Sequence, residues 1–299
     1  MKTSSALTPP SDIYQTVTDR IVAAIEAGAG EPVMPWHRTG LSSVIPINAV
    51  TGNRYRGINI VSLWSAAQHR DYPHGVWASY KQWREIGAQV RKGETSSPVV
   101  FYKEFEVEPD PEATDDDGKR RVARASHVFN CAQVDGYVPA DPVPPLPAIE
   151  RDATAQAFVD ATGADIGIGG EQAYYRPATD HIQMPDEHLF RNPDTHIRSQ
   201  DWFCVLSHEL AHWSGAKHRL DRQFGKRFGD QAYCAEEMCA ELTSAFTVTA
   251  LGLTPQPRVD HARYIEHYLN LMKADKSAIF AAAAKAAQSS DYLAAFSQG

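Results

Sequence analysis

Two histidines one helical turn apart, with a carboxylate beside the first, are the residues of this sequence best suited to chemistry. They stand in the segment His208-Glu209-Leu210-Ala211-His212. Residues i and i+4 of a helix share a face, so both imidazoles can direct a ring nitrogen at one Zn²⁺ ion. Glu209 would lie beside that ion, where it can accept a proton from a water molecule. The spacing predicts a zinc site with Glu209 as catalytic base, although such ligands also accept Mn²⁺ or another divalent ion.

A catalytic zinc ion usually takes three protein ligands, and one choice for the third lies close to the histidine pair. The run from His208 through Gly215 to His218 matches the metzincin pattern, in which the glycine allows a turn that returns the last histidine to the metal. The alternative is that His218, between Lys217 and Arg219, is an ordinary basic surface residue.

A glutamate from a second helix is the other choice for the third ligand. Residues 232–251 have a helical pattern with an apolar stripe, flanked by Glu237 and Glu241. Glu237 could ligate the metal, and Glu241 could accept a hydrogen bond from the free ring nitrogen of a ligating histidine. Both glutamates could equally be solvated, but an unpaired charge beside the stripe would be costly. Tyr233 and His261 are candidates for the oxyanion donor that peptide hydrolysis requires.

The helix that carries the two histidines has signals for both of its ends. Ser199 can cap its first turn, and Asp201 suits the positive end of the helix dipole. Gly215 is a natural terminator. The apolar residues between these signals could bury the helix: Trp202, Phe203, Val205, Leu206 and Leu210.

The other patterns predict an α+β protein with two domains. In the first half the expected elements are helices over 13–27 and 80–86, and a hairpin of strands over 99–102 and 128–133 around an acidic loop. In the second half they are helices over 153–162, 258–274 and 276–287, and strands over 173–176 and 181–184, in addition to the two metal-bearing helices.

Prolines mark the boundary between the two domains. Five prolines fall within residues 138–147, so this segment cannot be a helix and should form an extended connector. We therefore predict an N-terminal α/β domain over 1–137, a proline-rich linker over 138–149 and a second domain over 150–299. A chain of 299 residues, 43% of them hydrophobic, can supply each domain with its own core.

Basic and aromatic residues are concentrated in the first half, although the chain as a whole has a net charge of -8. Residues 38–103 contain nine lysines and arginines against three acidic residues, interleaved with tryptophan and tyrosine. Bases stack on aromatic rings while cations follow the phosphates, so this mixture suits single-stranded DNA, although many of the aromatic residues could be core. The best surface candidates lie at two glycine turns: Arg54, Tyr55 and Arg56, and Arg91 and Lys92.

Several blocks of the sequence resemble a known family. Residues 173–177, 180–185, 208–215, 219–220, 233 and 236–242 resemble the zincin-like metallopeptidase domain of ArdC-type antirestriction proteins of conjugative plasmids. Residues 36–37, 48–59, 77–83 and 90–94 resemble the single-stranded-DNA-binding domain that these proteins share with TraC-type primases. The resemblance implies a zincin-like fold for the second domain, with Glu237 as third ligand and Glu241 beside a ligating histidine.

The resemblance also implies a function. It suggests an antirestriction protein that binds single-stranded DNA and protects incoming plasmid DNA during conjugation, with a zinc-dependent peptidase-like site. The alternative is a zinc metalloprotease that cleaves a host restriction protein or a DNA-bound protein, with DNA binding for targeting only. No apolar run approaches the ~20 residues of a membrane span and no signal peptide is apparent, so we expect a cytoplasmic protein without a membrane partner.

Overall fold

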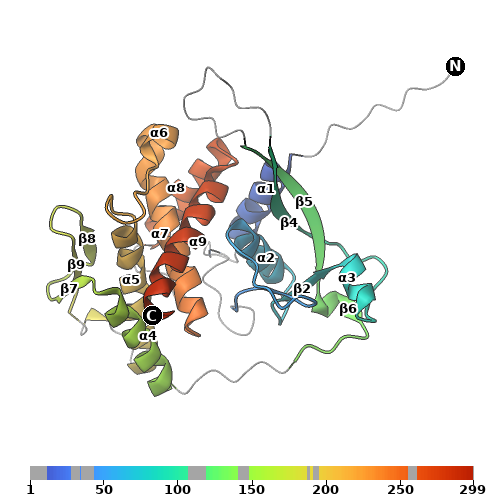
Figure 1. Cartoon of the computed structure of the whole chain (residues 1–299), viewed down its shortest axis with the longest axis horizontal. Helices are drawn as coiled ribbons and strands as arrows, with labels where there is room; N and C mark the ends of the chain where they lie inside the picture. Colours follow the sequence, from blue (N-terminus) through green and yellow to red (C-terminus); the bar gives the residue numbers. More distant parts are fainter. Residues whose placement is uncertain are drawn as a thin grey trace.

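The structure, a computed structural model, describes residues 12–27, 34, 44–106, 119–140, 148–186, 189–190, 195–254 and 261–298. It is a mixed α+β structure in which the sheet of the N-terminal half and the helices of the C-terminal half lie on opposite sides (Figure 1). Most of the proline-rich segment falls outside the described residues, so the linker and the domain boundaries stay predictions.

The N-terminal half is built on a four-stranded sheet in the order β1-β2-β5-β4. β1 and β2 are parallel, the other neighbours are antiparallel, and β3 and β6 form a separate antiparallel pair. The predicted hairpin is present, with strands longer than expected, whereas the pattern analysis missed α2 and β2. The elements are α1 (Ile13–Glu26), β1 (Ile47–Asn48), α2 (Ile58–His69), β2 (Val76–Ser79), α3 (Tyr80–Glu85), β3 (Gln89–Val90), β4 (Ser97–Glu106), β5 (Lys119–Asn130) and β6 (Val134–Asp135).

Helix α2 covers the outer edge of this sheet. The Asn59 side chain donates to the Val100 carbonyl at 2.8 Å and accepts from the Val100 N–H at 2.7 Å. The Ser62 hydroxyl donates to the Pro98 carbonyl at 3.0 Å. These bonds satisfy backbone groups of the edge strand β4 that would otherwise be open to pairing with another chain.

The C-terminal half combines a small sheet, in the order β7-β9-β8, with six α-helices among the described residues. β9 is parallel to β7 and antiparallel to β8. The structure confirms both predicted metal-bearing helices and both predicted strands, and adds β7. None of the helices it describes is long and apolar enough to cross a membrane. The elements are α4 (Ala148–Thr162), β7 (Asp165–Ile168), β8 (Tyr174–Arg176), β9 (His181–Met184), α5 (Thr195–Ser214), α6 (Gly225–Phe228), α7 (Ala232–Ala250), α8 (His261–Ala274) and α9 (Ala278–Ala295).

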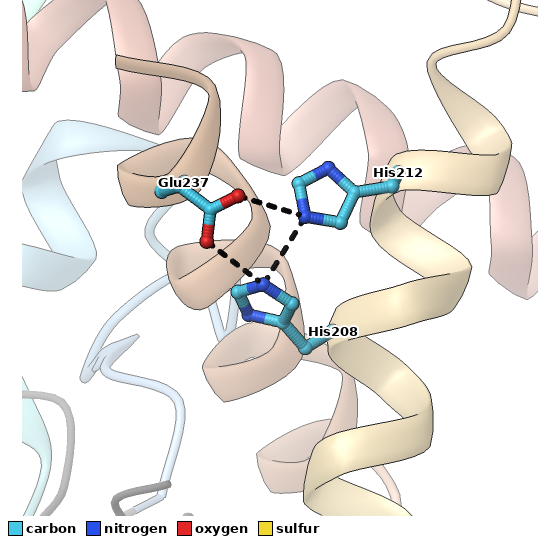
Figure 2. Close-up of side chains that lie close together, drawn as sticks. All are labelled: His208, His212 and Glu237. Atoms are coloured by element: carbon cyan, nitrogen blue, oxygen red, sulfur yellow. Dashed lines mark hydrogen bonds and ion pairs between the residues drawn. The ribbon is translucent and has the colours of Figure 1, made fainter. Parts of the chain in front are cut away.

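Helices α5 and α7 lie side by side and carry the side chains drawn in Figure 2. The prediction that Ser199 caps α5 is wrong, because the helix begins at Thr195 and Ser199 lies within it. The predicted end is confirmed: the helix stops at Ser214, immediately before Gly215. Phe203, Leu206 and Leu210 of α5 are buried in a cluster with α4 and β9.

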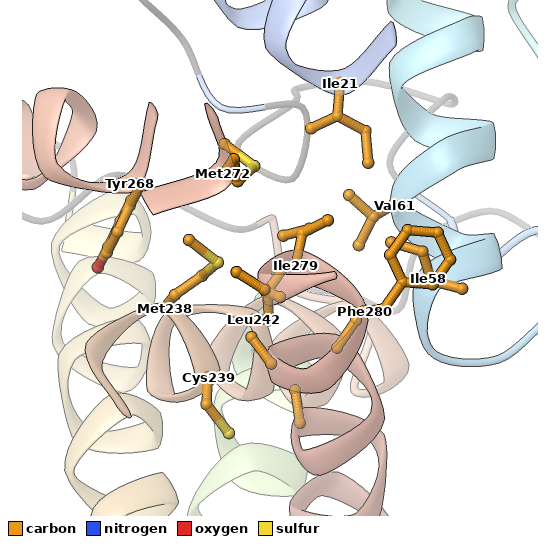
Figure 3. Close-up of a cluster of buried hydrophobic side chains, with 14 of the residues drawn as sticks. Ile21, Ile58, Val61, Met238, Cys239, Leu242, Tyr268, Met272, Ile279 and Phe280 are labelled. Atoms are coloured by element: carbon orange, nitrogen blue, oxygen red, sulfur yellow. The ribbon is translucent and has the colours of Figure 1, made fainter. Parts of the chain in front are cut away.

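One hydrophobic cluster crosses from the N-terminal half to the C-terminal half. In it, Ile21 of α1 and Val61 of α2 pack with Leu242 of α7 and Ile279 and Phe280 of α9 (Figure 3). Smaller clusters lie within each half. Besides the clusters within each half, α1 and α2 therefore bury apolar surface against the C-terminal helices.

Candidate metal centre

Three side chains from α5 and α7 converge at one point. His208 and His212 project from one face of α5, and their Nε2 atoms lie 3.2 Å apart (Figure 2). The carboxylate of Glu237 on α7 faces both rings: Oε2 is 3.5 Å from Nε2 of His208, and Oε1 is 3.4 Å from Nε2 of His212. This is the only group of three potential metal ligands found among the described residues.

The spacing of these ligand atoms fits a small divalent ion. Zinc bonds nitrogen and oxygen at about 2.0–2.1 Å, so two ligand atoms of a tetrahedral site stand about 3.3 Å apart. The observed separations of 3.2, 3.4 and 3.5 Å are close to that value. Two neutral imidazoles whose Nε2 atoms face each other would also repel unless a proton or a cation lies between them. The two nitrogens and one carboxylate therefore fit Zn²⁺, and Mn²⁺ as well.

Electrostatics favour positive charge at this point between the helices. Burial by itself raises the pKa of Glu237, but hydrogen bonds with His208 and His212 outweigh it and hold that pKa far below its usual value. Burial lowers the pKa of His212, but hydrogen bonds with Glu236 and Glu237 outweigh it and raise the pKa to about 9. A carboxylate kept ionised in a buried position is suited to holding a cation.

Two further carboxylates of α7 face the other ring nitrogens of the histidines. Oε1 of Glu236 lies 3.0 Å from Nδ1 of His212, in a hydrogen bond. Oε2 of Glu241, which is buried, lies 3.3 Å from Nδ1 of His208, although the two atoms are not aligned as a hydrogen bond. Spacing along the helix predicts a supporting role for Glu241 only, whereas in the structure Glu236, which directly precedes the predicted ligand, also lies against a histidine.

Glu209 and Tyr233 are the other catalytic candidates whose side chains the structure describes. Glu209 is buried beside His208 on α5, and its negative charge helps to raise the pKa of His212. Tyr233 stands one turn before Glu237 on α7, with its hydroxyl 3.2 Å from that of Tyr264. The side chain of His261 lies outside the described residues. The roles of Glu209 and Tyr233 stay predictions.

His218 is not brought to the other two histidines. Its side chain is 61% exposed, and Nε2 lies 3.3 Å from Oδ2 of Asp180. Asp180 also binds both terminal nitrogens of Arg219, at 2.8 and 2.6 Å, and the guanidinium of Arg219 stacks on the Trp213 ring at 3.5 Å. The chain after α5 is thus tied to the β8–β9 turn, and of the two candidates for the third ligand the structure places only Glu237 beside His208 and His212.

The three residues predicted to bind DNA at the first glycine turn differ from one another in their exposure and contacts. Arg54 is exposed, without an ion pair to any residue that the structure describes. Tyr55 is half-buried against the core, and its hydroxyl accepts from the Asn48 amide at 3.3 Å. Arg56 forms an ion pair with Asp291 of α9. Only Arg54 of these three is free to contact phosphate without breaking a contact seen here.

At the second predicted turn, too, one basic residue has contacts within the fold and the other is exposed. Arg91 donates to the carbonyls of Ala132 and Val134, at 2.5 and 3.4 Å, and pairs with Glu94 and Asp135. Lys92 is exposed and, like Arg54, has no ion pair within the described ranges. Arg91 therefore has a structural role, and Lys92 is the better candidate for phosphate contact.

Helix α3 lies between these two turns. Its Gln82 accepts from the Asn48 amide at 3.2 Å, beside the first turn, and the hydroxyl of Tyr80 accepts from Gln89 at 3.1 Å, beside the second. The Tyr80 ring is 46% exposed, and Lys81 next to it is exposed. The structure thus adds Tyr80 and Lys81 to the candidate surface between the two turns.

Two helices that bring two histidines and a glutamate together, behind an N-terminal α+β half, are features that can be compared with known protein families. Residues 153–285 match the family of zincin-like metallopeptidases, and residues 11–129 match the N-terminal domain of the anti-restriction factor ArdC. The chain belongs to the ArdC-type antirestriction proteins, with an ArdC N-terminal domain followed by a zincin-like metallopeptidase domain.

Solved structures and curated relatives are similar to this chain over nearly its whole length. The metal-free crystal structure of the antirestriction protein ArdC from plasmid R388 is 36% identical, with a TM-score of 0.75 over 96% of this chain and 98% of that chain. A Mn(II)-bound structure of the same protein gives a TM-score of 0.74 over 95% and 98%. The uncharacterized protein y4eC of Sinorhizobium fredii (strain NBRC 101917 / NGR234) is 46% identical over 98% of this chain and 95% of its own length. A DNA primase TraC of Escherichia coli is 33% identical over 97% of this chain, which spans only 20% of that primase.

Replacement of the third ligand should abolish metal binding. We expect Glu237→Ala to lose the metal, because two histidines alone leave the ion with too few protein ligands, whereas His218→Ala should retain it. Elemental analysis of purified protein dialysed against trace Zn²⁺ or Mn²⁺ measures the stoichiometry directly. Loss of metal in His218→Ala with retention in Glu237→Ala would contradict the assignment.

The Asp180 contacts should stabilise the fold in a pH-dependent way. The hydrogen bonds from Arg219 outweigh burial and lower the pKa of Asp180 from 3.8 to about 2. A carboxyl whose pKa is lower in the folded state contributes stability in full above its unfolded pKa and loses it as the pH falls through the folded pKa. The difference in free energy of unfolding between the wild type and Asp180→Asn, from urea titrations, should therefore be constant above about pH 5 and shrink toward pH 2. A difference that does not vary with pH would refute this account.

Proposed function

We propose that this protein binds single-stranded DNA, protects incoming plasmid DNA from restriction during conjugation, and carries a zinc-dependent peptidase-like site. The observation that carries the proposal is the end-to-end similarity to the antirestriction protein ArdC from plasmid R388, over 96% of this chain and 98% of that one. We place this function in the cytoplasm, where incoming DNA meets restriction enzymes.

In the proposed peptidase site, each residue has a separate task. His208, His212 and Glu237 hold the metal, which is Zn²⁺ or, as in the related Mn(II)-bound structure, Mn²⁺. When bound, such an ion polarises a scissile carbonyl and lowers the pKa of water. Glu209 accepts the proton of the attacking water and delivers it to the leaving amine. A protein or peptide is the corresponding substrate.

The DNA-binding surface of this proposal lies on the N-terminal half. Arg54 and Lys92 contact phosphates, and the exposed ring of Tyr80 offers a face on which a base can stack. Tyr55, Arg56 and Arg91 were also predicted to bind DNA, but their contacts within the fold favour a supporting role. Because the whole chain is acidic, binding should depend on this local patch and weaken steeply with salt.

A second candidate function is favoured by the residues of the candidate metal centre itself, because two histidines and a glutamate are a ligand set of zinc peptidases. In this alternative the protein is a metalloprotease that cleaves a host restriction protein or a DNA-bound protein, and DNA binding only brings it to its target. Both versions place the metal and the DNA on the same residues. They differ in one respect: protection of the DNA requires the catalytic base Glu209 only if the protein acts as a protease.

Removal of the proposed base distinguishes the two versions. Glu209→Gln, which is nearly isosteric in this buried position, should keep full metal stoichiometry and reduce any peptide cleavage by about 10²–10⁴-fold. Under the proposal, Glu209→Gln still protects plasmid DNA in a conjugation assay against a restricting host. Loss of protection together with loss of cleavage would favour the protease alternative, and unchanged cleavage would eliminate the role of Glu209.

Loss of two exposed cations should weaken DNA binding without affecting the fold. The double variant Arg54→Ala, Lys92→Ala should bind single-stranded oligonucleotides more weakly at every sequence, and each phosphate contact removed should reduce the magnitude of the salt slope by about 0.7. Fluorescence anisotropy of the full-length chain at several salt concentrations measures both effects. The matched control is Lys217→Ala, an exposed cation of the C-terminal half. Equal affinity of the double variant and the wild type would exclude this surface.

A further inference from the structure

An arginine that no motif explains lies buried next to the metal centre. The side chain of Arg222 is 1% exposed, although it carries a full positive charge. It stands where α5, α7 and α9 meet: one terminal nitrogen donates to the Ala211 carbonyl at 2.8 Å, and the other donates to the Ser289 hydroxyl at 2.7 Å. A guanidinium is costly to bury, so a structure that retains one must satisfy its hydrogen bonds and its charge.

The charge of Arg222 is balanced by Glu236, one residue before the proposed metal ligand. Nε of Arg222 donates to Oε2 of Glu236 at 2.8 Å, and a terminal nitrogen of Arg222 pairs with Oε1. This two-point contact fixes the plane of the carboxylate as well as its position. Oε1 of Glu236 is also the atom that lies 3.0 Å from Nδ1 of His212.

We infer that Arg222 and Glu236 are a positioning pair that orients His212 for metal binding. Arg222 holds the carboxylate, and Glu236 accepts a hydrogen bond from Nδ1–H of His212, so that Nε2 is the ring nitrogen that faces His208 and Glu237 and is presented to the metal. A ligating histidine that donates its second ring nitrogen to a carboxylate binds metal more tightly, because its tautomer and orientation are fixed. The inference rests on the proposed metal centre and adds to it two residues to which the sequence analysis assigned no role.

The same contact explains the glycine at the end of α5. A Cβ atom at Gly215 would lie 2.5 Å from a terminal nitrogen of Arg222 and 2.6 Å from its Cζ. The guanidinium cannot move aside cheaply, because its hydrogen bonds to Ala211, Ser289 and Glu236 would be lost. Gly215 therefore leaves room for Arg222, and the match to the metzincin pattern at this position does not arise from a turn toward His218.

The experiment follows the ring of His212 in full-length protein loaded with Zn²⁺. In the wild type, the Nδ1 proton of His212 should appear in ¹H–¹⁵N spectra as a slowly exchanging, downfield resonance. In Glu236→Leu this resonance should disappear, and the Zn²⁺ affinity, from competition with a chelator, should fall by about 10–100-fold. Glu236→Gln, whose side-chain oxygen can still accept a hydrogen bond from Nδ1–H of His212, should restore the resonance and part of the affinity.

Matched variants separate positioning from simple stabilisation. Ser289→Ala removes one partner of Arg222 on α9 and should lower the melting temperature while leaving the His212 resonance in place. Glu241→Gln should alter the resonances of His208 and not those of His212. Gly215→Ala and Arg222→Lys should each weaken Zn²⁺ binding. Combined with Glu236→Leu, neither should weaken Zn²⁺ binding further, because both act through the carboxylate that this variant has already removed.

The outcomes separate the inference from the function on which it rests. If the wild type binds no Zn²⁺ or Mn²⁺, the proposed metal centre is wrong and the positioning role falls with it. If the wild type binds metal and Glu236→Leu retains both the affinity and the His212 resonance, the inference is overturned and the metal centre stands. If Arg222→Lys and Glu236→Leu weaken binding additively, Arg222 does not act through Glu236.

Discussion

Three carboxylates on one side of α7 are the constraint around which the candidate metal centre is organised. Glu237 faces both histidines of α5, Glu236 lies against His212, and Glu241 lies against His208. Carboxylates this close together repel one another in a low-dielectric interior, so each needs a cation or a hydrogen-bond donor within reach. Among the described residues, the two imidazoles and the buried guanidinium of Arg222 lie within reach of these carboxylates, and the proposed metal ion would add a further cation.

The position of α7 is in turn fixed by hydrophobic packing against the helices on its other sides. It is buried along most of its length, and Leu242 packs with Ile279 of α9 and with Ile21 of α1 (Figure 3). Since α1 and α2 belong to the N-terminal half, the half that carries the proposed DNA surface also supports the helix that carries Glu237. The two halves share a core, and the ion pair between Arg56 and Asp291 adds a surface contact between them.

The loop that follows α5 shows how one sequence pattern can serve a different purpose. Gly215 and His218 match a metzincin signature, yet the glycine leaves room for a buried arginine and the histidine lies on the surface beside Asp180. The contacts of Arg219 with Asp180 and with the Trp213 ring direct this segment to the β8–β9 turn. A sequence that matches the metzincin pattern can therefore be assigned to the metzincins only when the structure shows that its third histidine reaches the metal site.

Local spacing by itself determined that His208 and His212 share a helix face and that a helix carries Glu237 and Glu241. It also determined that β4 and β5 form a hairpin. These features depend on residues that lie close together in the chain. The pattern missed α2, whose residues are buried on most sides and show no clear stripe, and it misplaced the start of α5 at Ser199. Spacing left His218 and Glu237 both open and the family resemblance implied Glu237, but only the tertiary structure placed Glu237 beside the two histidines and His218 away from them. Only the tertiary structure revealed Arg222 behind Glu236. Those contacts depend on the packing of α5, α7 and α9, which no spacing along the chain records.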